Sequence, residues 1–301
     1  MSHSGFAAII GAPNSGKSTL VNRLVGSKVS IVTHKVQTTR FPVRGVMMHG
    51  DAQVVLVDTP GIFAPKRRLD RAMVQSAWEG ATDADALVHL VDARAWAGQG
   101  DRTEDEAIIA RLKGLGRRAI LALNKIDLVD RQALLGAAKA LFDTGVYSDV
   151  LMISGLNGDG VDQLADLLAK AMPEGPFLFP ADQAADIPVR LLAAEVTREK
   201  LMLRLHQEIP YQLTVETETW EQHKNGSVKV EQMIHVSREG HRSIVLGKGG
   251  QTIKEVGMAA RQELAGILGK PVHLFLRVKV SERWMESRDR YSALGLDFDA
   301  Q

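Results

Sequence analysis

The stretch Gly11-Ala12-Pro13-Asn14-Ser15-Gly16-Lys17-Ser18 decides the fold of the amino-terminal half of this chain. It fits the phosphate-loop pattern GxxxxGK[ST], follows an apolar run at Phe6 to Ile10, and opens a helical pattern at Lys17 to Val25. In such a loop, backbone N–H groups and the helix N-terminus surround phosphates, the lysine reaches the β and γ phosphates, and the final hydroxyl can ligate magnesium. This context predicts a nucleotide site rather than an ordinary glycine turn.

Short apolar runs alternate with helical patterns up to about residue 172, the order typical of a parallel sheet covered by helices on both faces. The predicted strands are Phe6 to Ile10, Val43 to Met48, Gln53 to Asp58, Ala86 to Asp92, Ala119 to Asn124 and Asp149 to Ser154. The second and third lie close together in the sequence, which favours one antiparallel hairpin. We therefore expect an α/β P-loop NTPase domain on a mainly parallel, six-stranded sheet.

Two further motifs end predicted strands. Asp58-Thr59-Pro60-Gly61 places an aspartate where it can approach magnesium through water, and the Gly61 N–H where it can meet a γ-phosphate. In Asn124-Lys125-Ile126-Asp127, the Asp127 carboxylate could accept from both the N1–H and the exocyclic amine of guanine, a donor pair that adenine lacks. Either motif alone is weak, but the carboxyl ends of parallel strands share one edge of a sheet, where such folds bind ligands.

These three motifs resemble, residue by residue, those of a translation-factor-class, Ras-like GTPase. The resemblance implies that Thr39, or less readily Thr38, in the loop Gln37-Thr38-Thr39-Arg40 ligates magnesium when GTP is bound. Ile153-Ser154-Gly155 matches the base-contacting loop more weakly, because the family prefers Ser-Ala there, although Gly155 can still offer its backbone N–H. Besides the phosphate loop, the expected GTP-binding residues are Asp58, Thr59, Pro60, Gly61, Ile62, Asn124, Lys125, Ile126, Asp127, Ser154 and Gly155.

The implied reaction is in-line attack of water on the γ-phosphate, with Lys17, Thr39 and Gly61 as the catalytic residues and Ser18, Thr39 and Asp58 as the Mg²⁺ ligands. Ile62 stands where Ras-type enzymes carry a water-orienting glutamine, and an isoleucine cannot orient water. We therefore expect slow intrinsic hydrolysis, with the water placed by backbone groups, by a partner or by a monovalent cation. Related GTPases with an asparagine at the position of Asn14 resemble potassium-activated enzymes, which makes Asn14 a candidate K⁺ ligand.

Residues 173–188 carry four prolines without a sustained period and read as a linker, after which the pattern changes. A helical spacing from Val189 leads into strands at Tyr211 to Thr219 and Ser227 to Val236, joined through Asn225-Gly226. A helix from about Thr252 to Leu268 and a strand from Val272 to Val280 follow. The predicted domains are 1–172, 189–283 and a polar, loosely held tail at 284–301.

Between the apolar run Ile244-Val245-Leu246 and the predicted helix lies the loop Gly247-Lys248-Gly249-Gly250. A GxxG loop in this setting resembles that of an α+β type II KH domain, which clamps about four nucleotides of single-stranded RNA. The window from Arg238 to Arg283 contains nine lysines and arginines against four acidic residues, which fits a local phosphate contact. We expect Gly247, Lys248, Gly249, Gly250 and Lys254 to bind RNA.

One GTPase domain, a short linker and one carboxyl-terminal KH domain together resemble the bacterial Era family of GTPases over nearly the whole chain. The runs Arg198-Glu199-Lys200-Leu201 and Glu208-Ile209-Pro210-Tyr211 look like that family's own sequence between the two domains. The resemblance implies a GTPase that binds 16S ribosomal RNA near its 3′ end, takes part in 30S subunit maturation, and associates peripherally with the inner membrane. It also implies a monomer with no DNA partner.

Composition limits the remaining alternatives. The 301 residues are 45% hydrophobic with a formal net charge of +1, so no whole-chain positive field indicates nucleic acid and any such contact must be local. The absence of cysteine excludes disulfides, thiol catalysis and cysteine-ligated zinc, and no apolar run reaches the length of a membrane span, so we expect a cytoplasmic protein. Two alternatives stay open: a membrane-associated or cell-cycle signalling switch whose KH domain contacts protein, and a P-loop ATPase or kinase with an unrelated tail.

Overall fold

The computed structural model describes residues 2–300, which form two compact units. The first unit contains the chain up to Ser30, Thr39–Asp186, and the segment from Leu294 onward. The second unit contains Ile31–Thr38 and Ile187–Ala293. The first and the last of the described residues therefore both belong to the first unit, and a short piece of the amino-terminal half belongs to the second.

The first unit is built on a seven-stranded sheet with the order β6-β5-β4-β1-β3-β2-β7. Its strands are β1 (His3–Ile10), β2 (Val43–His49), β3 (Ala52–Asp58), β4 (Ala86–Asp92), β5 (Ala119–Asn124), β6 (Tyr147–Ile153) and β7 (Ala185–Asp186). The five strands β1, β3, β4, β5 and β6 pair in parallel, and β2 pairs antiparallel with β3. The α/β class, the mainly parallel sheet and the expected hairpin are thus confirmed.

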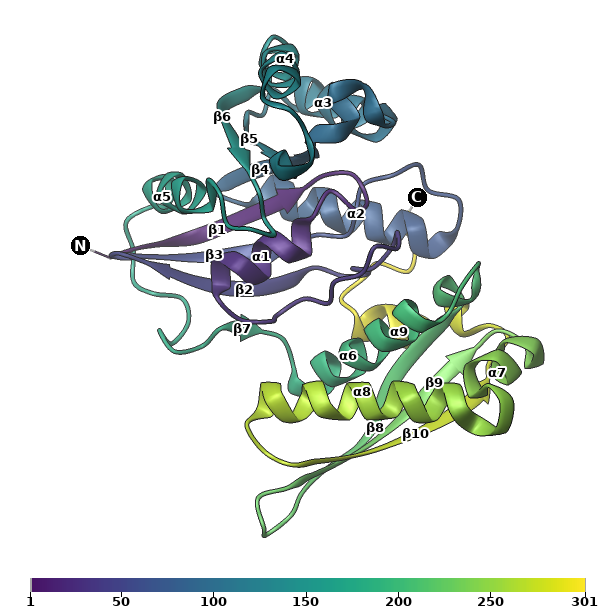
Figure 1. Ribbon diagram of the computed structural model, residues 1–301. Helices are drawn as coiled ribbons and strands as arrows, with labels where there is room; N and C mark the ends of the chain where they lie inside the picture. The colour runs from purple at the N-terminus through teal and green to yellow at the C-terminus, as the bar shows by residue number, and fades with distance from the viewer. Residues whose placement is uncertain (1, 301) are drawn as a thin grey trace. The chain divides into compact units, whose positions relative to one another are not determined.

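Helices cover both faces of this sheet (Figure 1). They are α1 (Lys17–Val25), α2 (Arg68–Asp83), α3 (Thr103–Leu115), α4 (Arg131–Phe142) and α5 (Val161–Ala171), with short turns η1 (Ala95–Gln99) and η2 (Ile126–Leu128). One hydrophobic core lies under α2, α3 and α4, and a second lies under α1 and α5. Burial on both faces explains why β3 and β5 are continuous apolar runs rather than alternating ones.

The edge strand β7 comes from the predicted linker and makes the sheet one strand wider than the six expected. Its residues Ala185 and Asp186 pair with Gly45 and Arg44 of β2. Before it, Gln53 bonds the backbone of Leu178 and Phe179 through its amide group at 2.7–2.9 Å. A two-residue pairing is too short to leave a period in the sequence, so prolines were the only visible signal there.

The carboxyl-terminal tail is more ordered than we expected. Trp284 and Tyr291 are buried, in a turn η5 (Trp284–Glu286) and a short helix α9 (Arg288–Ala293). Beyond Leu294 the chain lies against α2, where the guanidinium of Arg68 stacks 4.2 Å from the centre of the Phe298 ring. Large aromatic side chains provide this burial despite the polar composition of the segment.

The second unit has the element order of a type II KH domain. The helix α6 (Val189–Arg204) and turn η3 (Ile209–Tyr211) precede strands β8 (Leu213–Gln222) and β9 (Val228–Val236). The helix α7 (Glu239–Leu246), the turn η4 (Lys248–Gly250), the helix α8 (Gln251–Leu268) and the strand β10 (Val272–Val280) follow. The sheet order is β10-β9-β8, with β9 and β10 parallel, and two clusters of buried residues join it to α6, α7 and α8.

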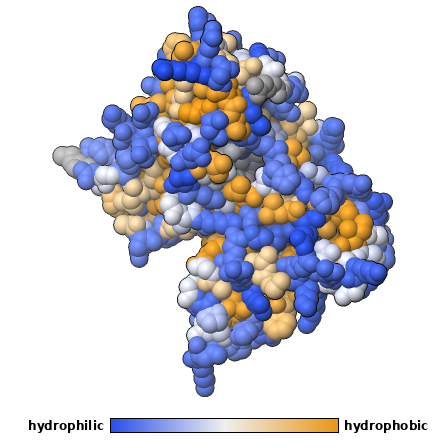
Figure 2. All heavy atoms as spheres, viewed as in Figure 1, coloured by the Kyte–Doolittle hydropathy of each residue, from blue (hydrophilic) through white to orange (hydrophobic). Residues whose placement is uncertain are grey.

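Hydrophilic side chains cover most of the face seen in Figure 2, and hydrophobic residues gather there in separate patches. This pattern agrees with the mean hydropathy of −0.07. Across residues 2–300, no helix has both the length and the apolar character needed to cross a bilayer.

Candidate nucleotide and nucleic-acid sites

The phosphate loop has the local conformation that its glycines allow. Gly16 has φ +104°, and a Cβ there would lie 2.4 Å from Nδ2 of Asn124. That amide nitrogen donates a hydrogen bond of 2.7 Å to the carbonyl oxygen of Ser15. Only glycine allows this close approach. The asparagine of the NKxD motif therefore hydrogen-bonds the phosphate loop directly.

Lys17 is buried at the start of α1, where its ammonium donates to the carbonyl oxygens of Gly11 at 3.1 Å and Ala12 at 2.9 Å. Burial lowers the pKa of Lys17 to about 8, although the nearby Asp58 carboxylate acts in the opposite direction. A bound polyphosphate would favour the charged ammonium. Lys17 is therefore expected to carry its full positive charge once an anion is bound.

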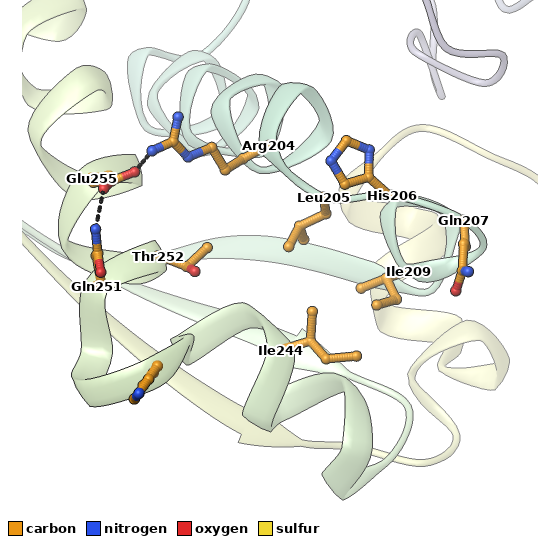
Figure 3. A pocket seen from close by; sticks show the side chains of 10 residues that line it. Arg204, Leu205, His206, Gln207, Ile209, Ile244, Gln251, Thr252 and Glu255 are labelled. Carbon is orange, nitrogen blue, oxygen red and sulfur yellow. Dashed lines mark hydrogen bonds and ion pairs between the residues drawn. The ribbon is translucent and has the colours of Figure 1, made fainter.

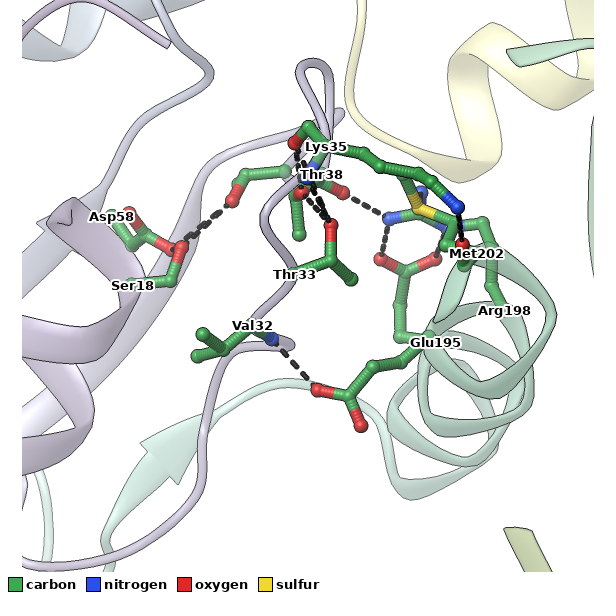
Figure 4. A network of polar contacts seen from close by, with 11 residues as sticks. Ser18, Val32, Thr33, Lys35, Thr38, Asp58, Glu195, Arg198 and Met202 are labelled. Carbon is green, nitrogen blue, oxygen red and sulfur yellow. Dashed lines mark hydrogen bonds and ion pairs between the residues drawn. The ribbon is translucent and has the colours of Figure 1, made fainter. Parts of the chain in front are cut away.

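The three side chains that the sequence predicts as Mg²⁺ ligands lie together next to Lys17. The Ser18 hydroxyl donates to Oδ2 of Asp58 at 2.7 Å and lies 2.9 Å from Oγ1 of Thr39, which is itself 3.4 Å from Asp58 Oδ2 (Figure 4). Thr38 points elsewhere, because its hydroxyl bonds Thr33 at 2.6 Å and the Lys35 carbonyl at 2.7 Å. Of the two candidate threonines, Thr39 is therefore the one that lies beside Ser18 and Asp58, the other predicted metal ligands.

This set fits Mg²⁺. Hydroxyl and carboxylate oxygens are the hard ligands that Mg²⁺ prefers, and a site completed by substrate phosphates needs only one or two of them from the protein. Asp58 is fully buried, and its Oδ1 has no hydrogen-bond partner among the described residues. Desolvation raises the pKa of Asp58, a cost that a cation at this place would offset.

Asn124 ends β5, and Lys125 and Asp127, the other residues that the sequence predicts to recognise the base, come directly after it. The Lys125 ammonium bonds the Asn14 carbonyl at 2.5 Å, while the Asp127 side chain is exposed on η2. The Gly155 N–H differs from our expectation, because it donates to Oδ1 of Asn124 at 2.9 Å instead of pointing at a base. Ser154 is buried and its hydroxyl accepts from the Asn157 N–H at 3.1 Å, so both residues stabilise the loop around Asn124.

The DTPG segment lies against the phosphate loop. The Thr59 hydroxyl bonds the Ile9 carbonyl at 2.7 Å, and a Cβ on Gly61 would lie 3.0 Å from Cα of Pro13. The Ile62 N–H donates to the Gly11 carbonyl at 3.1 Å, and the Ile62 side chain is buried in the core under α2. Ile62 therefore cannot orient water, and only its backbone lies at the site.

Asp92 is a site residue that we did not predict. Its carboxylate pairs with the Lys125 ammonium at 2.7 Å and with the Arg94 guanidinium at 2.7 Å, which fixes the lysine over the phosphate loop. Its position could have indicated this role, because Asp92 ends the strand β4 at the same edge of the sheet as the other motifs.

The predicted RNA-binding loop of the second unit connects α7 to α8. Gly247 has φ +75°, and a Cβ there would lie 2.1 Å from Oγ1 of Thr252, so only glycine lets the loop turn this tightly. The side chains of Lys248 and Lys254 are exposed. The apolar run Ile244-Val245-Leu246 before the loop, for which the sequence predicts no particular structure, is the end of the helix α7.

A second contact network was missed altogether. The segment Ile31–Thr38 lies against α6 within the second unit, held through its backbone at Val32 and Thr38 and through the Lys35 side chain (Figure 4). The Val32 N–H donates to the Glu199 carboxylate at 2.7 Å, the Lys35 ammonium donates to the carbonyls of Met202 and Leu205, and the Arg198 guanidinium donates to the Thr38 carbonyl. Each pair has a backbone N–H or carbonyl on one side, and because every residue carries such groups, no sequence pattern could have indicated these pairs.

Comparisons with known proteins agree with this geometry. Residues 6–125 match the family model described as a 50S ribosome-binding GTPase, and residues 208–285 match the KH domain model. GTPase Era of Caulobacter vibrioides is 61% identical, over 98% of this chain and 96% of its own length, and that of Maricaulis maris is 55% identical, over 98% and 97%.

Two solved structures are similar over the same extent. Era in complex with MgGDPNP and nucleotides 1506–1542 of 16S ribosomal RNA has a TM-score of 0.91 at 37% identity, covering 98% of this chain and 99% of that one. An Aquifex aeolicus Era variant bound to GDP and AlF4⁻ has a TM-score of 0.90 at 36% identity, covering 97% and 99%. With the phosphate loop, NKxD motif and GxxG loop placed as described, the chain belongs to the Era family of GTPases.

Proposed function

We propose that this protein is a GTP-hydrolysing switch that binds small-subunit ribosomal RNA near its 3′ end and assists assembly of the 30S subunit. The observation that supports a switch is the pair of neighbouring residues Thr38 and Thr39. The Thr39 hydroxyl bonds Ser18 in the first unit, while the carbonyl of the preceding residue accepts from Arg198 in the second. Support for the RNA comes from the Era structure that contains nucleotides 1506–1542 of 16S ribosomal RNA.

The chemistry follows from the residues around the phosphate loop. Lys17, with its charge restored by the phosphates, stabilises negative charge that develops on the γ-phosphate, and in this proposal the Gly61 N–H does the same. Ser18 and Thr39 would ligate Mg²⁺ directly and Asp58 through water; when bound, this ion supplies further positive charge. Because the Ile62 side chain is buried in the core, the attacking water lacks the side chain that orients it in Ras-type enzymes, and intrinsic hydrolysis is slow.

In the second unit, the GxxG loop holds the RNA backbone, with Lys248 and Lys254 contacting phosphates. When GTP is hydrolysed, Thr39 loses its contacts to the γ-phosphate and the adjoining backbone changes position. Because Arg198 bonds the Thr38 carbonyl, this change is transmitted to α6. The RNA affinity of the KH domain therefore depends on the nucleotide bound.

Two substitutions test the two halves of this proposal. Asp127→Asn should shift the preference from guanine toward xanthine nucleotides, measured by competition for a fluorescent nucleotide; unchanged guanine preference would contradict the GTP assignment. Gly249→Asp together with Gly250→Asp should abolish binding of a 16S 3′ fragment while GTP binding is retained. If RNA affinity survives, the KH domain contacts another kind of partner, such as a protein.

We also propose that the protein is monomeric and cytoplasmic and makes a peripheral contact with the inner membrane. Sedimentation equilibrium tests the first point, and flotation with vesicles of anionic phospholipid tests the last. Retention of the protein in the unbound fraction would exclude a direct lipid contact.

A further inference from the structure

A cavity of about 670 Å³ lies within the second unit, beside the GxxG loop and on the side of α6 (Figure 3). Its lining comes from the end of α6, the turn η3, and the helices α7 and α8. No residue of the sheet lines it. Lys248 of the GxxG loop is part of the lining, so the cavity is continuous with the surface at which we propose that RNA is held.

Part of the inner surface of the cavity is apolar. Leu205 and Ile209 are buried at its base, and Ile244 projects toward them from α7 although its side chain is 50% exposed. An isoleucine half exposed over an open cavity leaves apolar area in water that a flat, weakly polar group would cover. The size is within the range of about 300–1,000 Å³ found for small-ligand sites and suits one nucleotide.

The rim of the cavity is polar and carries both charges. The Glu255 carboxylate accepts a hydrogen bond of 3.0 Å from the Gln251 amide and is paired with the Arg204 guanidinium. Arg204, His206 and Lys248 are exposed donors around the same opening. A carboxylate can accept from the exocyclic amine of cytosine, adenine or guanine, whereas uracil presents a carbonyl at that place.

We propose that this cavity is a nucleobase subsite for one nucleotide that flanks those clamped by the GxxG loop, with a preference for a base that carries an exocyclic amine. The base covers Ile244, its amine donates to Glu255, and its phosphate meets Arg204 or Lys248. A nucleotide has a flat apolar face, a hydrogen-bonding edge and an anion, which a peptide side chain or a lone phosphate does not combine. This inference rests on the proposed RNA binding and extends it.

Fluorescence anisotropy with the full chain tests the subsite. The probes are a tetranucleotide and longer single strands from the 16S 3′ region, in which each flanking base is replaced in turn by uracil or by an abasic residue. At one flanking position, either replacement should weaken binding to the unmodified protein by about tenfold. Ile244→Ala should weaken binding of the longer strands by about fivefold and leave tetranucleotide binding unchanged.

Two variants make the outcome specific. Glu255→Gln, which can donate to a uracil carbonyl, should reduce the penalty for uracil at that position to about twofold or less. Leu203→Ala, at an exposed leucine of α6 outside the cavity, is the matched control and should bind every probe normally. Loss of all RNA binding only in the GxxG variant, with no flanking-base effect and normal Ile244→Ala binding, would overturn the subsite but not the proposed function. A protein without the substitutions that binds no RNA would overturn both.

Discussion

Arg198 donates a hydrogen bond from its guanidinium to the backbone carbonyl of Thr38, although 160 residues separate the two in sequence. The Arg198 side chain is only 1% exposed, and the Glu195 carboxylate holds it through bonds of 2.7 and 2.5 Å. A buried guanidinium fixed in this way is a rigid donor. It defines the position of the residue that precedes the Mg²⁺-ligating candidate Thr39.

Removing this donor should release the segment Ile31–Thr38 from α6. We expect Arg198→Ala to increase amide hydrogen exchange in that segment and to lower the free energy of unfolding of the second unit by about 2–3 kcal/mol, because the largely buried Glu195 loses its partner. Arg190→Ala is the control, since Arg190 lies on the same helix but bonds only the exposed carbonyls of Thr217 and Glu218. Equal exchange in the two variants would show that Arg198 does not hold the segment.

Nucleotide binding should draw a proton onto Lys17. Burial lowers the pKa of Lys17 to about 8, so close to half of the molecules carry a neutral amine at pH 8. Phosphates favour the ammonium and raise this pKa, so GDP binding at pH 8 takes up protons and GDP affinity falls as the pH rises further. Titration calorimetry without magnesium, in buffers of different ionisation enthalpy, measures the uptake.

Lys17→Arg provides the control for this proton, because a guanidinium stays charged throughout the accessible pH range. Its GDP binding should be weaker but independent of the buffer. A buffer-independent enthalpy for the unsubstituted protein would mean that Lys17 is already fully charged before the nucleotide enters.

Potassium should accelerate hydrolysis more than sodium. Asn14 is exposed at the tip of the phosphate loop with φ +61°, and its carbonyl is fixed by the Lys125 ammonium. A cation held by the Asn14 side-chain oxygen would place positive charge beside the γ-phosphate. It would thereby assist hydrolysis at a site where the buried Ile62 cannot orient the water. We expect GTP hydrolysis to be at least about tenfold faster in potassium, and Asn14→Ala to remove the difference. Equal rates in the two salts would exclude this role.

The carboxyl-terminal segment should stabilise the first unit through α2. Phe298 stacks on Arg68, and the Arg71 guanidinium donates to the Ala300 carbonyl at 3.4 Å. Because this contact is partly exposed, Phe298→Ala should cost about 1 kcal/mol of unfolding free energy, measured by urea denaturation. Phe142→Ala, at an exposed phenylalanine on α4, is the comparison and should be close to neutral. A Phe298→Ala variant as stable as this comparison would show that the segment contributes nothing.

The sequence predicts the first unit well because its signals are local. The phosphate loop, DTPG and NKxD each end a strand of a parallel sheet, so the edge shared by Lys17, Asp58 and Asp127 follows from strand direction alone. The antiparallel hairpin and the glycine loop before α8 are likewise encoded by short patterns.

What the sequence could not show depends on contacts between distant segments. Arg198 is visible in the sequence only as part of a family-like run, and its partner in the distant segment is the Thr38 backbone carbonyl, a group which every residue possesses. The edge strand β7 is two residues long, and the tail from Leu294 onward is held by the stacking of Arg68 on Phe298, by the burial of Leu296 and by hydrogen bonds to α2. Tertiary pairing, rather than local preference, determines each of these.

The most direct measurement is the affinity of the full chain for a 16S fragment equivalent to nucleotides 1506–1542, compared between saturating GDPNP and saturating GDP. If the nucleotide state is transmitted through Thr38 and Arg198, the two dissociation constants differ by about fivefold or more, and Arg198→Ala brings them together. Identical constants for the unsubstituted protein in both nucleotide states would contradict the account.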